Sequence, residues 1–211
     1  MASRNGKDAD AASATTRSLK ADLRRQVLAR RDALGAAERK SLSERITARL
    51  LELDACRKAA CVMAYIGFGS EIDTARFVAD ILAQGKTLVL PRIERGNRTL
   101  KLFEVRDPEN QLEAGVWGIR QPRVDLCPEI SAAQIEFVLA PGVGFTRHCE
   151  RLGYGGGFYD RFIRGLVTRP ALVAAAFALQ VLPELPTSET DQRVDLVMTE
   201  DAAYYAPSGR Q

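Results

Sequence analysis

Hydrophobic residues recur with helical spacing in the first third of the chain. From Ser18 onward they fall within an arc of roughly 80° on an ideal helical wheel. These residues are Leu19, Leu23, Val27 and Leu34. The next stretch, from about Ala36 to Leu53, has the same periodicity, and its apolar side carries Leu42, Ile46, Leu50 and Leu53. The pattern therefore predicts two amphipathic helices at the start of the ordered chain.

Short apolar runs then alternate with helical stretches, which is typical of a parallel sheet. Residues 60–66 read as a buried strand, and the helix after it is expected to have Thr74 as its N-cap and to end at Gly85. Residues 87–90 form the next expected strand, which Pro91 should stop. Such a β-α-β unit has parallel strands and a right-handed crossover.

The remaining apolar runs predict the rest of one sheet. Further strands are expected at residues 100–105, 137–140, 171–177 and 194–198, with 137–140 in a central position. At 211 residues and 46% hydrophobic content the chain can build one sizeable core. We expect a single three-layer α/β/α domain with a mainly parallel, Rossmann-like central sheet and two N-terminal helices. We place it at residues 17–205, between a disordered tail at 1–16 and a mobile tail at 206–211.

A glycine cluster stands out in the sequence RLGYGGGFYDR, residues 151–161. Glycine allows close approach of a ligand to the main chain, so clustered glycines beside fixed charges suggest backbone N–H groups aimed at an anion, with phosphate the obvious candidate. The spacing after Gly157 is helical, and a helix N-terminus would favour phosphate further. Asp160 would then lie in the first turn, where it could hold a divalent cation. The alternative is a connecting turn with a solvated ion pair.

Basic residues are concentrated near the N-terminus. Residues 1–60 hold 14 Lys and Arg against 8 Asp and Glu, whereas residues 61–211 hold 16 against 19. On the first helix, Lys20, Arg24 and Arg31 form a stripe beside the apolar arc. They could reach a phosphate chain, or they could be a solvated basic flank. RNA binding by these helices is a weaker hypothesis, because no aromatic residues are interleaved with the charges.

Three further polar or aromatic residues lie where the predicted topology places ligands. Glu71 follows the carboxyl end of the first strand, where such sheets bind ligands, although it could be only a solvated loop charge. Trp117, the one tryptophan, lies between glycines and could stack on a planar ligand or pack over the rim of the core. Asp191 could join Asp160 on a cation or serve as a turn residue.

The sequence offers no evident protein nucleophile. His148 is the only histidine, and adjacent residues on an extended segment point apart, which disfavours a dyad with Cys149. The four cysteines lack metal-ligand spacing, so we expect reduced thiols and a cytoplasmic protein; they are Cys56, Cys61, Cys127 and Cys149. No apolar run has transmembrane length, and the opening lacks a signal-peptide pattern. A phosphate cradle, cations and carboxylates suit direct phosphoryl transfer from a nucleotide to its substrate.

These residues together resemble the 5-formyltetrahydrofolate cyclo-ligase (5,10-methenyltetrahydrofolate synthetase) family, from Lys20 to about Glu200. The glycine-tyrosine-aspartate segment is the most specific feature. The other matching segments are KADLR (20–24) with Arg31 and Leu34, EIDT (71–74), LPRI (90–93), GVWGIRQP (115–122), APGVGF (140–145), AFALQ (176–180) and TDQRVDLVMTE (190–200).

The resemblance implies conversion of 5-formyltetrahydrofolate to 5,10-methenyltetrahydrofolate with ATP and Mg²⁺, through a phosphorylated formyl intermediate and with release of ADP and phosphate. It implies no covalent nucleophile, with Arg151 and Lys20 stabilising phosphate. The implied ATP-binding residues are Lys20, Arg24, Arg151, Leu152, Gly153, Tyr154, Gly155, Gly156 and Gly157. The implied substrate-binding residues are Ile66, Glu71, Trp117 and Tyr159. The implied metal ligands are Asp160 and Asp191.

The chain departs from the family pattern at a few positions. Thr146 and Cys149 stand where the family commonly has aspartate and glycine, and Thr190 stands where histidine or asparagine is frequent. A non-catalytic or slow folate- or nucleotide-binding paralogue is therefore the alternative function. We expect small-molecule substrates, a reduced folate and ATP, and a monomer that binds neither nucleic acid nor membranes.

Overall fold

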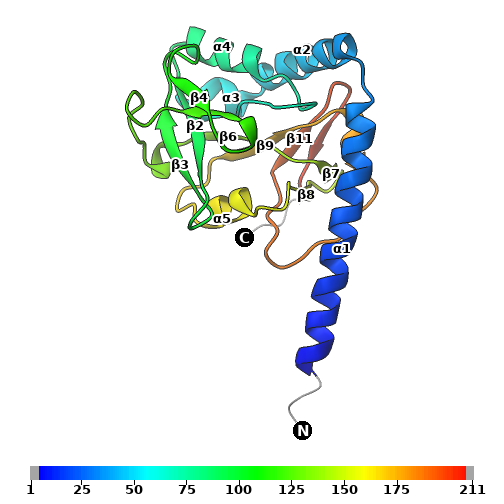
Figure 1. Cartoon of the computed structure of the whole chain (residues 1–211). Helices are drawn as coiled ribbons and strands as arrows, with labels where there is room; N and C mark the ends of the chain where they lie inside the picture. The colour runs from blue at the N-terminus through cyan, green and yellow to red at the C-terminus, as the bar shows by residue number, and fades with distance from the viewer. Residues whose placement is uncertain (1–4, 208–211) are drawn as a thin grey trace.

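A central β-sheet with helices on its two faces organises the molecule (Figure 1). The computed structural model describes the chain from residue 5 to residue 207. The helices are α1 (Asn5–Asp32), α2 (Ala36–Glu52), α3 (Asp54–Lys58), α4 (Ala75–Ala83) and α5 (Phe158–Arg164), with 3₁₀ turns η1 (Val116–Gly118), η2 (Ala132–Gln134) and η3 (Ala178–Gln180). The strands are β1 (Cys61–Met63), β2 (Thr87–Glu94), β3 (Thr99–Glu104), β4 (Leu112–Ala114), β5 (Arg120–Pro122), β6 (Phe137–Ala140), β7 (Gly144–Thr146), β8 (Arg151–Leu152), β9 (Ala171–Ala175), β10 (Val181–Leu182), β11 (Leu196–Met198) and β12 (Ala203–Tyr205).

The main sheet has seven strands in the order β12-β11-β9-β6-β1-β2-β3. The five inner strands run parallel, whereas the edge strands β12 and β3 are antiparallel to their neighbours. β6 occupies the central position, as predicted, and all four of its residues are buried. Helices on both faces explain why this strand is a continuous apolar run rather than an alternating one.

The predicted three-layer arrangement is confirmed. Figure 1 shows α2, α3 and α4 together on one side of the sheet and α5 on the other. Each face has its own hydrophobic cluster: Ile46 of α2 and Phe77 of α4 belong to the first, and Ile163 of α5 belongs to the second. The β-α-β unit formed by β1, α4 and β2 has the expected parallel pairing.

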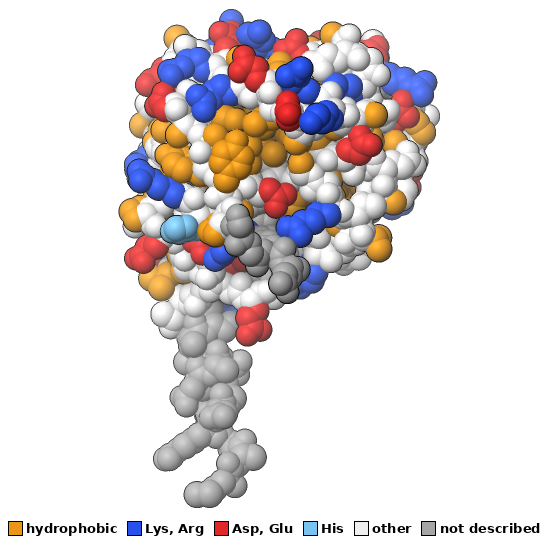
Figure 2. Space-filling model, turned by 180° about the vertical axis from the view of Figure 1, so that it is seen from behind, with side chains coloured by type: hydrophobic (Ala, Val, Ile, Leu, Met, Phe, Trp, Pro, Cys, Tyr) orange, Lys and Arg blue, Asp and Glu red, His pale blue; other side chains and the backbone are white. Residues whose placement is uncertain are grey.

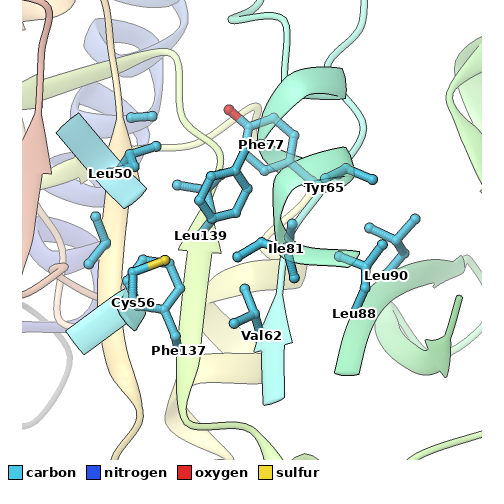
Figure 3. Close-up of a cluster of buried hydrophobic side chains, with 14 of the residues drawn as sticks. Leu50, Cys56, Val62, Tyr65, Phe77, Ile81, Leu88, Leu90, Phe137 and Leu139 are labelled. Carbon is cyan, nitrogen blue, oxygen red and sulfur yellow. The ribbon is translucent and has the colours of Figure 1, made fainter. Parts of the chain in front are cut away.

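Large side chains from helices and strands interlock under α4 (Figure 3). Phe77 and Ile81 from this helix pack with Phe137 and Leu139 from β6, and all four have no exposed surface. Each such side chain contributes about 1.5–3 kcal/mol relative to remaining in water. This packing fixes the strand ends from which the site is built.

The first helix has a role that the pattern did not reveal. α1 runs along one side of the molecule (Figure 1), and it packs through Val27 against Val143, Leu152 and Leu182. These three residues belong to or adjoin a small second sheet of order β10-β7-β8. Because the glycine cluster follows β8 directly, α1 is held beside it.

The structure has regular features inside both segments that were expected to be tails. Residues 1–16 were expected to be disordered, but α1 is helical from Asn5, which fits the high helix propensity of its several alanines. The mobile C-terminal tail from Ala206 stays a prediction; Ala206 itself donates its N–H to the carbonyl of Asp195 at 2.9 Å. Residues 1–4 and 208–211 lie outside the described residues.

Of two local predictions around the β-α-β unit, the one on Pro91 is wrong and the one on Thr74 is right in position only. Pro91 does not stop β2, which continues to Glu94; its missing N–H faces the side of β1, whose pairing already ends at Val89. Thr74 is the N-cap residue of α4, as predicted, but its side chain makes no capping bond. Its hydroxyl instead donates to the carbonyl of Tyr65, and Asp73 accepts the N–H of Ala75.

Candidate active site

Several strand ends and the glycine loop open onto one cavity of about 570 Å³. Tyr65 and Ile66 enter it after β1, Pro141 enters it after β6, and residues of β2 form its side. The loop and the first turn of α5 close the opposite wall. The lining is Tyr65, Ile66, Phe68, Glu71, Leu90, Pro91, Ile93, Leu100, Trp117, Ile119, Arg120, Gln121, Pro141, Arg151, Gly153, Tyr154, Gly156, Gly157, Phe158, Tyr159 and Asp160.

The glycine loop, residues 153–157, adopts the backbone that its composition suggested. Gly155 and Gly157 have φ angles of 98° and 67°, a left-handed region that other residues rarely adopt. Arg24 of α1 lies against Gly155 and donates from Nε to the carbonyl of Gly153 at 2.7 Å. The loop is therefore held by a cation from a distant part of the sequence, a contact that the basic stripe did not predict.

A buried ion pair links the loop to α5. Arg151 Nη2 lies 2.6 Å from Asp160 Oδ1, and the arginine side chain is only 2% exposed. The same carboxylate oxygen accepts the N–H of Gln192. Arg151 Nε and the hydroxyl of Tyr159 are buried without a hydrogen-bond partner among the described residues. Burial raises the pKa of Tyr159, partly opposed by the charge of Arg151. Unpartnered buried polar atoms facing a cavity are places where a ligand can supply the missing bonds.

Two carboxylates near the loop provide oxygen donors for a cation. Lys20 Nζ lies 2.5 Å from Asp191 Oδ2, which also accepts the N–H of Ser188. Burial lowers the pKa of Arg24, whereas the nearby charges of Asp191 and Asp160 raise it, so both acids lie close to this arginine. No group of three or more His, Cys, Asp or Glu that could hold a metal occurs among residues 14–207, whose side chains the structure describes. A two-carboxylate donor set fits Mg²⁺, which usually keeps several waters and shares its remaining positions with phosphate oxygens.

A third cluster connects Glu71 to the loop. Glu71 is 8% exposed and accepts a hydrogen bond from the Tyr154 hydroxyl at 2.5 Å and from the N–H of Phe68 at 3.1 Å. Arg31 Nη1 donates to the same hydroxyl at 3.0 Å. Burial raises the pKa of Glu71, and these hydrogen bonds and the arginine charge counteract it. The sequence left open whether Arg31 contacts phosphate or belongs to a solvated flank; it is 3% exposed, so it is not solvated, and it donates to Ser70 and Tyr154.

Aromatic and aliphatic side chains make the rest of the cavity wall. Trp117 is 62% exposed, and its ring meets the edge of Phe158 at a centroid distance of 6.4 Å. Trp117 has a φ of 58°, and its large exposed fraction shows that the ring does not cover the core as an ordinary rim residue would. Phe68 and Leu100 line the cavity as well but were not singled out from the sequence. The sequence could have indicated both, because Phe68 lies two residues after Ile66 and Leu100, which pairs with Ile93, begins the strand expected at residues 100–105.

The structure brings most of the predicted site residues together. All four expected substrate contacts line the cavity, and so do Arg151, Gly153, Tyr154, Gly156 and Gly157 of the expected nucleotide set. Arg24 and Gly155 contact each other beside the lining residue Gly153, whereas Lys20 and Asp191 pair with each other outside the lining. Leu152 differs, because its side chain is buried in a cluster with Val27 and its backbone pairs with β7. His148 is exposed (Figure 2) and Cys149 is fully buried, so the two do not form a dyad.

Comparisons with known proteins agree with this arrangement. A sequence model of the 5-formyltetrahydrofolate cyclo-ligase family matches residues 16–200. The chain belongs to this family. It is 29% identical to a mouse 5-formyltetrahydrofolate cyclo-ligase over 90% of this chain and 98% of that one, and 27% identical to the Escherichia coli (strain K12) protein over 81% and 94%.

Solved structures of cyclo-ligase relatives share the fold. A 5,10-methenyltetrahydrofolate synthetase from Aquifex aeolicus superposes with a TM-score of 0.79 at 33% identity, covering 92% of this chain and 95% of that one. A synthetase from Mycoplasma pneumoniae gives a TM-score of 0.70 at 22% identity, covering 86% and 98%, and supports the fold alone. Within residues 5–207, no helix is long and apolar enough to span a bilayer.

The departures from the cyclo-ligase pattern have a structural account. Cys149 adopts a φ of 62°, the conformation that glycine would take without strain. Thr146 Oγ1 accepts the N–H groups of His148 and Glu150, so a hydroxyl serves as the acceptor in this turn. The turn therefore closes, and β7 still pairs with β8 ahead of the glycine loop.

Proposed function

We propose that this cyclo-ligase converts 5-formyltetrahydrofolate to 5,10-methenyltetrahydrofolate while ATP is cleaved to ADP and phosphate. The observation that carries the proposal is the single cavity, in which an apolar, aromatic wall and a buried carboxylate face a glycine loop backed by Arg151. The wall suits a planar pteridine ring, and Glu71 can accept two N–H bonds from its cyclic guanidine edge. The loop suits the phosphates of a nucleotide.

The proposed chemistry needs no nucleophile from the protein. A formamide oxygen is a poor leaving group, so the formyl oxygen first attacks the γ-phosphorus of ATP, and the bond to the bridging oxygen breaks to release ADP. N10 then bonds to the formyl carbon and loses its proton, and the carbon–oxygen bond breaks to release phosphate. The negative charge of the transferred phosphoryl group would be balanced by the fixed positive charges of Arg151, Lys20 and Arg24, none of which bonds covalently to it. α5 has only seven residues, so these side-chain charges matter more than its dipole.

Asp160 and Asp191 are the residues that would hold Mg²⁺. One oxygen of each carboxylate is committed to a cation and to a backbone N–H, at Oδ1 of Asp160 and Oδ2 of Asp191. The second oxygen of each is left for a metal that also binds phosphate. When bound, Mg²⁺ would neutralise charge on the phosphates. The four cysteines are buried and none of them is in a disulfide, which supports the proposal of a reducing, cytoplasmic setting.

The test is the near-UV absorbance of the methenyl product. We expect product only when 5-formyltetrahydrofolate, ATP and magnesium are all present, with ADP formed in equal amount. Asp191→Ala should lower kcat strongly, whereas Glu189→Ala, an exposed acid in the same loop, should match the parent. Normal turnover with magnesium chelated would contradict the proposal. Binding of folate and nucleotide without ADP formation would instead favour the slow or non-catalytic paralogue.

A further inference from the structure

Tyr154 connects two parts of the cavity that the proposed function assigns to different substrates. Its backbone belongs to the glycine loop, between Gly153 and Gly155, whereas its hydroxyl donates to Glu71 Oε1 at 2.5 Å. The ring also packs against Phe68 with a centroid distance of 5.4 Å. A residue of the phosphate-facing loop therefore touches the carboxylate that faces the pteridine pocket.

Two arginines of α1 hold the backbone and the side chain of this part of the loop in place. Arg24 donates to the carbonyl of Gly153 at 2.7 Å, and Arg31, two turns later, donates to the Tyr154 hydroxyl at 3.0 Å. Arg31 is itself held by Ser70, whose hydroxyl donates to Asp32. The arginine is 3% exposed, so it is a rigid part of the site rather than a surface charge. Movement of the loop consequently moves the Tyr154 hydroxyl against an otherwise fixed Glu71.

We propose that Tyr154 couples the two binding events, so that nucleotide on the glycine loop raises the affinity of the folate pocket. The inference rests on the proposed function. Glu71 has one lone pair of Oε1 used by Tyr154 and one of Oε2 used by the N–H of Phe68, which leaves one acceptor position on each oxygen. The Tyr154 bond fixes the rotation of the carboxylate, and ordering the loop with phosphates secures that bond. Reciprocity requires folate to raise nucleotide affinity by the same factor.

Titration of Glu71 gives a second readout that a purely structural role would not move. The groups facing this carboxylate are Arg31, Tyr65, Tyr154 and Tyr159. The hydrogen bond from Tyr154 stabilises the ionised form, which is the form able to accept two substrate N–H bonds. Burial already raises the pKa of Glu71, and removal of the hydroxyl removes one opposing influence. The acid limb of folate binding should therefore move to higher pH when the hydroxyl is lost.

The experiment compares the parent with Tyr154→Phe, which keeps the ring and deletes only the hydroxyl. Tyr205→Phe, on an exposed tyrosine of β12, is the matched control. Calorimetry gives the dissociation constant of 5-formyltetrahydrofolate without and with saturating ADP and magnesium. The ratio of the two constants is the coupling factor, in which a general loss of affinity cancels.

For the parent and Tyr205→Phe we expect a coupling factor of at least about fivefold, the lower end of usual allosteric effects. For Tyr154→Phe we expect a factor below about twofold and an acid limb shifted to higher pH. An unchanged factor in Tyr154→Phe, or no coupling in the parent, would overturn the proposal. A parent that binds folate and forms methenyl product but shows no coupling overturns only this inference. A parent that binds no folate overturns the proposed function as well.

Discussion

Removal of the Asp160 carboxylate tests the buried ion pair on which the glycine loop depends. Asp160→Ala leaves Arg151 Nη2 without its 2.6 Å partner, and Nε already lacks one. The remaining bond, from Nη1 to the carbonyl of Pro141 at 3.1 Å, is neutral. Loss of one partner of a buried pair costs about 3–5 kcal/mol because the other charge remains buried. Since Asp160 is 23% exposed and water can enter at its side, we take the lower end, about 3 kcal/mol.

That free energy corresponds to a fall in Tm of about 6–12 °C for a domain of this size. Asp160→Asn keeps an oxygen that can accept from Arg151 and Gln192 but loses the charge, so its loss should be about 1 kcal/mol. The order of Tm should be parent, Asp160→Asn, Asp160→Ala. Thermal unfolding followed by circular dichroism measures all three.

The control is a salt bridge of similar length on the surface. Asp201 lies 2.7 Å from Arg45, but both side chains are more than half exposed, so Asp201→Ala should change stability by no more than about 0.5 kcal/mol. Arg151→Met combined with Asp160→Ala should be less destabilised than the sum of the single variants, because no unpaired charge remains. A Tm for Asp160→Ala equal to that of Asp201→Ala would refute the reasoning, and so would strict additivity in the double variant.

Three further predictions concern single side chains whose exposure or burial sets the expected effect. Trp117→Ala should raise the KM for folate by about 5–10-fold through lost stacking, with little change in Tm because the ring is 62% exposed. An unchanged KM would argue against a pteridine beside Trp117. Leu126→Ala, at another exposed position, is the control. Burial, together with the charges of Glu136 and Glu104, raises the pKa of Cys61 to about 11, so iodoacetamide at pH 8 should label this thiol far more slowly in the native protein than in urea. Equal rates in the two states would contradict its burial. Phe77→Ala should lower the free energy of unfolding in urea by about 3–5 kcal/mol, because it leaves a cavity under α4. Val167→Ala, at a 95% exposed position, should leave this free energy almost unchanged. Similar losses for both variants would refute this account of the core.

The hydrophobic pattern alone located most strands of the sheet, because strands buried on both faces have continuous apolar sequences. The run at residues 137–140 identified the central strand, and glycines followed by helical spacing identified the loop before α5. Pro91 misled the strand prediction, since whether a missing N–H matters depends on which strands lie beside it. The helical start of α1 was missed for a similar reason, because its first residues carry no hydrophobic periodicity.

By itself, the sequence determined the layer architecture, the glycine loop and the kinds of side chain that surround a phosphate-bearing ligand. Only the tertiary structure decided that Arg31 donates to Tyr154, that Asp160 pairs with Arg151, and that Leu152 belongs to the core. The physical reason is that a charge has the same appearance in the sequence whatever its partner. Partners far apart in the chain become neighbours only after packing of α1 and the strand ends sets their distances and removes the water between them.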